Sequence, residues 1–263
     1  MKIDWSIVKK QTLWNYEDLI AKLQSVLDYA FVQEHYNHTF KQSKRYANKI
    51  RSGYLQNRGD KIVFINNIFA TLEKYERLGI KNYSNLICRV VTREQCRTFL
   101  QETDFNFYEL IRTLNYLLRW VLPFRIPIRE FIDVDIAIEM KYLASLKKQK
   151  IGSNLDIIEL GRDKAGRKKL SNITEIPLNF IMSLVNKADI SRLAYVRGKT
   201  VIHLCRSGYD TLEKLATANL TEMEVKMEAH YKTLGKSLSD FKAVIPLSWM
   251  VGGAKILPHV VKI

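Results

Sequence analysis

The spacing of apolar residues predicts a chain built from helices. From Asn15 onward, the segment YEDLIAKLQSVLDYAFVQEHYNHTF repeats apolar side chains every three or four residues, which is typical of one long amphipathic helix. Asn15 is the expected N-cap residue, with Asp18 three positions later. The segment NLTEMEVKMEAHYKTLG predicts another helix near the C-terminus. The five prolines and eleven glycines are few for an all-β protein with its many tight turns, so we expect an all-α fold.

Two stretches of the chain resemble each other at a constant shift of 71 residues. This shift aligns Ile80 with Ile151 and Arg93 with Lys164 and needs no gap. Two amphipathic helical segments could agree in this way by chance, but the unbroken register favours an internal duplication. Under the same shift, the proline-rich apolar turn of WVLPFRIPIREFI (120–132) aligns with the polar turn of SRLAYVRGKTVIH (191–203).

The repeats divide the expected fold into four parts. Two degenerate repeats of helix-hairpin-helix type follow an N-terminal helical extension, and a C-terminal helix and tail come last. The tail is apolar with a break at Gly252-Gly253, and we expect it to dock on the body of the protein. The expected ranges are 1–61 for the extension with its basic arm, 62–133 for the first repeat, 134–220 for the second and 221–263 for the tail.

The formal net charge of +15 favours association with a polyanion such as DNA, RNA or an acidic membrane surface. A merely soluble basic protein is the alternative. The start of the chain has no apolar signal core, and no run of about 18 apolar residues could cross a membrane. Three scattered cysteines fit no metal spacing and indicate reduced thiols. We therefore expect a cytoplasmic or nucleoid-associated protein without membrane contact.

Basic residues concentrate in the segment 41–61, which has seven Lys or Arg and one Asp. Tyr46 and Tyr54 lie among them. The segment is either a solvated helix face or an arm that contacts phosphates, and the sequence leaves both open.

The turn in LAYVRGKTVIHLC is the leading candidate site. We expect Leu193 and Val196 to anchor it in the core, while Gly198 lets another backbone come close. The amides of Gly198, Lys199 and Thr200 would begin the following helix. The unpaired N–H groups and positive dipole of a helix start can hold a phosphate. Downstream, Gly208 is expected to end this helix and Asp210 or Thr211 to cap the next.

Counter-charge surrounds the turn. Between Ile190 and Tyr209 there are four Lys or Arg and no acidic residue, as a surface facing phosphates requires. The first turn, with Arg125 and Arg129, is expected to be structural. Nothing resembles the Arg, Asn and Gln set that reads bases in the major groove. The predicted DNA contacts are Arg192, Val196, Arg197, Gly198, Lys199, Thr200 and Arg206, extended by Arg162, Lys164, Arg167, Lys168 and Lys169.

The segment 157–217 resembles the tandem helix-hairpin-helix proteins of the family called domain of unknown function 4332. The resemblance rests on Gly166-Arg167, Leu170, Val185-Asn186, Ala188-Asp189, the 195–200 turn and the run from Gly208 to Leu215. The turn is also similar to the C-terminal helix-hairpin-helix domain of archaeal Ski2-like repair helicases. These resemblances imply nucleic-acid binding. The commoner hairpin has glycines where this chain has Tyr195 and Arg197, so side chains are expected to make more of the contact.

The patterns favour no catalytic or metal chemistry. His35 and His38 could share a metal, but no further ligands complete the set. His203 is expected to pack or to lie beside a phosphate. Lys199 and Asp210 indicate a base-excision glycosylase only weakly, because the sequence shows no pattern of a pocket for a damaged base. We therefore predict a non-enzymatic, largely sequence-independent DNA-binding protein without cofactor. RNA binding is allowed, and the alternative is an accessory subunit that binds a protein partner, for example through the tail around Trp249.

Overall fold

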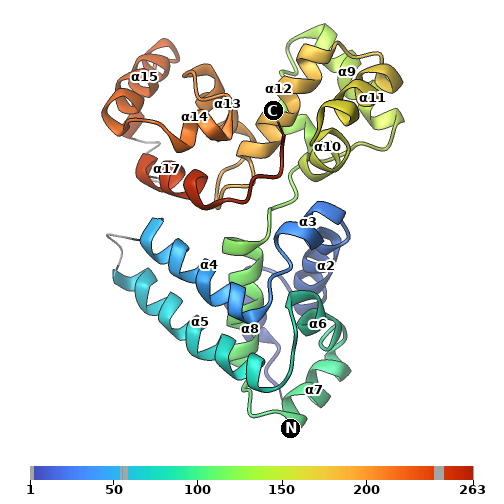
Figure 1. Cartoon of the computed structure of the whole chain (residues 1–263), viewed down its shortest axis with the longest axis vertical. Helices are drawn as coiled ribbons and strands as arrows, with labels where there is room; N and C mark the ends of the chain where they lie inside the picture. The colour runs from blue at the N-terminus through green and yellow to red at the C-terminus, as the bar shows by residue number, and fades with distance from the viewer. Residues whose placement is uncertain (1–2, 54, 56–58, 240–245, 263) are drawn as a thin grey trace. The chain divides into compact units, whose positions relative to one another are not determined.

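The computed structural model describes residues 3–53, 55, 59–239 and 246–262. Throughout these ranges the chain forms helices and turns and contains no strand, so the predicted all-α class is confirmed. The chain divides into two compact units, residues 1–122 and residues 123–263 (Figure 1). The segment 123–132, expected at the end of the first repeat, therefore packs within the second unit.

Unit 1 is organised around a buried aromatic core. The ring of Tyr75 stacks on Phe40 and Phe105, with centroids 5.2 and 4.2 Å away. Stacked and edge-on pairs of this kind add stability beyond the burial of their area. The helices of unit 1 are α1 (Ser6–Thr12), α2 (Tyr16–Leu27), α3 (Ala30–His35), α4 (Phe40–Gly53), α5 (Gly59–Arg77), α6 (Tyr83–Cys88), α7 (Arg93–Glu102), α8 (Phe107–Tyr116) and η1 (Leu117–Val121).

The first predicted helix is correct in its start and wrong in its length. The Asn15 side chain accepts a hydrogen bond from the Asp18 N–H at 2.7 Å, which makes it the expected N-cap of α2. The helix then ends at Leu27, because Tyr29 takes an extended conformation and begins α3 as its N-cap. The apolar period continues across this break, so periodicity alone could not reveal it.

The basic segment after residue 40 forms α4, which packs against α5 (Figure 1). Tyr46 is buried, with its ring edge-on to His38 at 5.3 Å, so it has no free face for a base. Lys44 forms an ion pair with Glu76 at 2.8 Å. Tyr54 lies outside the described residues. The remaining exposed cations of α4 keep the solvated-face interpretation open.

Unit 2 contains two groups of packed helices. In the first group, α10, α11 and α12 pack on one another and α9 packs on α11. In the second, α17 packs on α14 and α15, so the tail is docked, and its helix continues through Gly252-Gly253 without the expected break (Figure 1). The helices are η2 (Ile128–Phe131), α9 (Ala137–Lys148), α10 (Asn154–Gly161), α11 (Lys164–Thr174), α12 (Leu178–Ile190), α13 (Gly198–Arg206), α14 (Leu212–Ala216), α15 (Leu220–Thr233) and α17 (Leu247–Ile256).

Helix starts in the two units follow the register found in the sequence. The first residues of α6, α7 and α8 lie 71 positions before the first residues of α10, α11 and α12, respectively. Helices α6–α8 belong to unit 1 and α10–α12 to unit 2. The shared register therefore concerns positions in the sequence and not an arrangement in space. The internal duplication stays a prediction.

Candidate nucleic-acid interface

The turn between α12 and α13 is built as the sequence predicts. Leu193 and Val196 are buried at 1% and 0% exposure and hold the turn in the core of unit 2. Tyr195 has φ +65°, in the left-handed region that costs a side-chain-bearing residue about 1 kcal/mol. Arg197 is the N-cap of α13 without a capping bond from its side chain. Thr200, half-exposed, completes the first turn of the helix.

A close backbone approach does occur at Gly198, but the approaching segment is part of unit 2 itself. The Gly198 N–H donates to Glu130 Oε2 at 3.3 Å. A Cβ added to Gly198 would lie 2.4 Å from the Glu130 Cβ, so η2 packs directly against the start of α13. The Arg197 guanidinium lies 4.0 Å from the centre of the Phe124 ring. The Gly198 amide, which the sequence predicts to bind a phosphate, therefore donates to the Glu130 carboxylate of the same unit.

The structure gives Arg192 an internal role. Its side chain is fully buried and pairs with Asp189, to which Nε donates at 2.8 Å. Its Nη1 donates to the Pro258 carbonyl at 3.1 Å. The arginine therefore fastens the C-terminal segment to the end of α12, and we leave it out of the interface.

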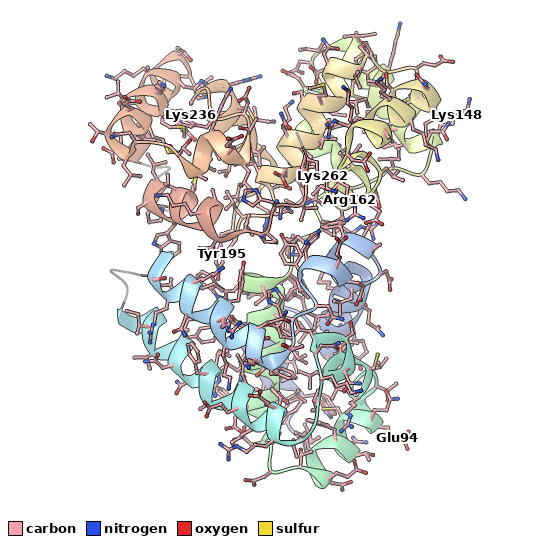
Figure 2. All side chains as sticks on the ribbon, viewed as in Figure 1. Glu94, Lys148, Arg162, Tyr195, Lys236 and Lys262 are labelled. Carbon is pink, nitrogen blue, oxygen red and sulfur yellow. The ribbon has the colours of Figure 1, made fainter. Side chains whose placement is uncertain are left out.

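Arg167 is also buried, at 7% exposure, and its Nη1 donates to the Gly161 carbonyl at 3.2 Å. This bond holds α11 against the end of α10. Arg162 is half-exposed, and its carbonyl accepts the Lys262 N–H at 2.7 Å, which places these two residues side by side (Figure 2). Val196, Gly198, Arg167 and Arg192 are thus the predicted contacts that lie inside the unit.

Three other predicted contacts share one exposed helix surface. Asp163 begins α11 by accepting the Gly166 N–H at 2.8 Å. The apolar side of the helix is buried through Leu170, and the helix itself contains no Asp or Glu. None of its exposed lysines forms an ion pair with a described residue. We call this surface the α11 face, and it consists of Lys164, Lys168 and Lys169.

A second basic surface follows α13. Lys199, His203 and Arg206 lie four and three residues apart, on one side of the helix, while Val201 and Leu204 are buried on the other. We call the three residues the α13 stripe. Arg206 Nη2 lies 3.2 Å from Asp133 Oδ2, so part of its charge is already balanced.

His203 of the α13 stripe belongs to a histidine pair that sequence reasoning missed. His203 Nδ1 lies 3.0 Å from His230 Nε2 of α15. Burial lowers the pKa of His203, and the charges of His230, Lys236 and Arg206 lower it further. Burial also lowers the pKa of His230. The partners are 27 positions apart, so no local pattern could reveal them.

The candidate metal-binding histidines His35 and His38 contact each other directly. His38 is within 3.0 Å of the His35 carbonyl oxygen through Nε2, not through a shared ligand. In the described ranges, no three His, Cys, Asp or Glu side chains gather as metal ligands. Gly208, at φ +93°, follows the end of α13, and the Thr211 hydroxyl caps α14, as predicted. No helix in the described ranges has the length and apolar character that crossing a membrane requires.

The described helices from α9 through α15 contain both basic surfaces, and they are also the region that comparison with known families recognises. Residues 137–244 match the family described as Domain of unknown function (DUF4332). This match includes the 157–217 run in which the sequence resembles the family. Comparisons with curated proteins and with solved structures give no match. The helix-hairpin-helix relationship stays a prediction.

Proposed function

We propose that unit 2 binds the phosphate backbone of nucleic acid without base specificity and without catalysis. The α11 face carries this proposal: three exposed lysines, without a carboxylate partner in the described residues, lie on a helix that has no acid. Lysine ammonium groups act as flexible point charges, which suit a backbone more than a base edge. The net charge of +15 adds long-range attraction to a polyanion.

The contact is proposed to run through side chains. Glu130 lies at the start of α13 and opposes a phosphate there by charge repulsion, while Lys199 and Arg206 project from the exposed side of the helix. The left-handed Tyr195 at a position where glycine is commoner supports the helix-hairpin-helix relationship. The common helix register likewise supports a duplicated ancestry for α6–α8 and α10–α12.

Charge reversal on the α11 face tests the proposal. The variant Lys164→Glu/Lys168→Glu/Lys169→Glu should bind a 20-base-pair duplex at least tenfold more weakly at about 50 mM salt, because three phosphate contacts are lost and replaced by repulsion. Fluorescence anisotropy measures the affinity, and circular dichroism checks the helix content.

A matched control changes the net charge equally. Lys214, Lys226 and Lys232 are exposed on α14 and α15 in acidic surroundings, for example with Lys214 paired to Asp210 at 2.6 Å. Their triple reversal to Glu should weaken binding less than about threefold, since only the long-range attraction falls. Equal losses in the two variants would contradict the assignment of the α11 face.

A second candidate function is favoured by an exposed apolar segment before and within α9. Val134, Ile136, Ile138 and Met140 are all exposed, beside a groove of about 440 Å³ lined in part by Ile202. Exposed apolar patches of this kind mark protein interfaces. Trp249 is half-buried in the docked tail, which does not favour the tail as the binding surface.

A photoreactive residue at Ile138 tests this candidate. It should cross-link one discrete protein in cells if the segment is an interface. The same residue at Val225, exposed on α15, is the control. Cross-linking that is indistinguishable between the two positions would contradict this function.

A further inference from the structure

The histidine pair between α13 and α15 lies within the basic surface but has no part in the fold's main core. Both side chains are half-exposed, and the facing ring nitrogens are 3.0 Å apart. At this distance one ring donates an N–H and the other accepts it, so the neutral pair is satisfied. One added proton leaves the shared hydrogen bond in place. A second would set two N–H groups against each other.

The charged groups acting on the pair are cationic. Lys199 and Arg206 come from α13 itself, and Lys236 follows α15. The Tyr231 ring packs against His203 with centroids 4.9 Å apart and brings no charge. One carboxylate is tied to this group, that of Asp133, which forms an ion pair with Arg206 at 3.2 Å. Protonation of either histidine therefore adds charge to a site that repels cations.

That electrostatic setting selects the chemical class of ligand. A metal ion would find two nitrogen ligands but three neighbouring cations, and no third ligand in the described residues. An anion with several acceptor oxygens meets the opposite conditions, because lysine, arginine and protonated histidine all donate hydrogen bonds to it. A phosphate group carries both the charge and the acceptors.

Building on the proposed function, we propose that His203 and His230 form a phosphate contact that takes up a proton when nucleic acid binds, so that unit 2 binds more tightly at lower pH. The phosphate stabilises the protonated pair and its cationic neighbours together. The pKa values of the free pair are lowered by burial and neighbouring charge, and a bound phosphate raises them, so the complex takes up a proton in the pH range between the free and bound pKa values.

Linkage gives the size of the effect. Uptake of one proton per complex changes affinity about tenfold per pH unit, in the range between the free and bound pKa values. Wild-type protein should therefore bind a 20-base-pair duplex roughly tenfold more tightly at pH 5.5 than at pH 7.5, at constant ionic strength. The His203→Gln/His230→Gln variant should gain less than about threefold, because glutamine keeps hydrogen-bonding groups but does not titrate.

The control is His259→Gln, since His259 is exposed in the C-terminal segment outside the pair. It should retain the wild-type pH dependence. Equal pH dependence in wild type and the double glutamine variant would overturn the inference while leaving the proposed function intact. Absence of duplex binding at both pH values would instead contradict the proposed function.

A direct readout on wild-type protein guards against a folding defect in the variant. Nuclear magnetic resonance of the histidine ring protons gives each pKa with and without a 12-nucleotide single strand. The pKa values of His203 and His230 should rise by about one unit on binding. Unchanged values for the pair in the saturated complex would overturn the inference.

Discussion

Replacing Arg192 by methionine tests whether this arginine stabilises the fold or contributes to nucleic-acid binding. The fully buried side chain pairs with Asp189, whose own side chain is 11% exposed. Methionine fills much of the same volume but leaves that carboxylate without its partner. Breaking a buried pair from one side costs about 3–5 kcal/mol. The Pro258 carbonyl also loses its donor, which costs about 1 kcal/mol more.

Urea unfolding followed by circular dichroism measures this cost. With a slope of roughly 2 kcal/mol per molar urea, a total loss of about 5 kcal/mol lowers the midpoint for unit 2 by about 2.5 M. The folded variant in the absence of urea should bind duplex within threefold of wild type, since the arginine has no exposed surface.

Two control variants test whether the lost stability comes from the buried ion pair. The Asp189→Leu/Arg192→Met variant should recover at least half of the lost stability, because neither charge is then left alone. The Lys199→Met variant should stay within about 0.5 kcal/mol of wild type, because that side chain is exposed. A midpoint shift below about 0.3 M for Arg192→Met, together with much weaker binding, would refute the internal role of Arg192.

Three further predictions concern stability. Gly198→Ala should lower the free energy of unfolding by about 1–3 kcal/mol in urea titrations, because the added alanine Cβ would lie 2.4 Å from the Glu130 Cβ. An unchanged urea midpoint would argue against the packing of η2 on α13. Leu13→Gly should raise the free energy of unfolding by about 0.5–1 kcal/mol, because the leucine is 73% exposed at φ +75°, and calorimetry that finds a loss would contradict this. The pKa values of His203 and His230 are lowered in the folded state, so the unfolded chain binds protons at a higher pH than the folded chain does. The contribution of the neutral histidines to stability is complete above about pH 6.5 and is lost as the pH falls from there toward the folded-state pKa values. As the pH decreases, the thermal midpoint should therefore fall less steeply for the double glutamine variant than for wild type.

The fold class and several helix boundaries could be predicted because their signals are local. Apolar period, capping residues and the glycine after α13 all act within a few positions of one another. Asn15, Gly208 and Thr211 therefore take the expected roles. The break at Tyr29 escaped prediction because the apolar pattern on both sides of it is continuous.

The candidate site was only partly predictable because burial of a charge depends on distant partners. Arg167 and Lys168 are adjacent in a basic run, yet the first is buried against α10 and the second is exposed. The partner of the Gly198 amide lies 68 positions away, and the carbonyl that holds Arg192 lies 66 positions away. Sequence identified the basic region, and tertiary contacts decided which cations face the solvent.

The salt dependence of duplex binding by wild-type protein tests the central claim most directly. Each phosphate neutralised contributes a slope of roughly −0.9 to log K against log salt concentration. The α11 face and the exposed cations of α13 should together give a slope of about −3 to −5 between 50 and 200 mM salt. A slope near zero, or no binding at about 50 mM salt, would contradict a surface built to hold the phosphate backbone.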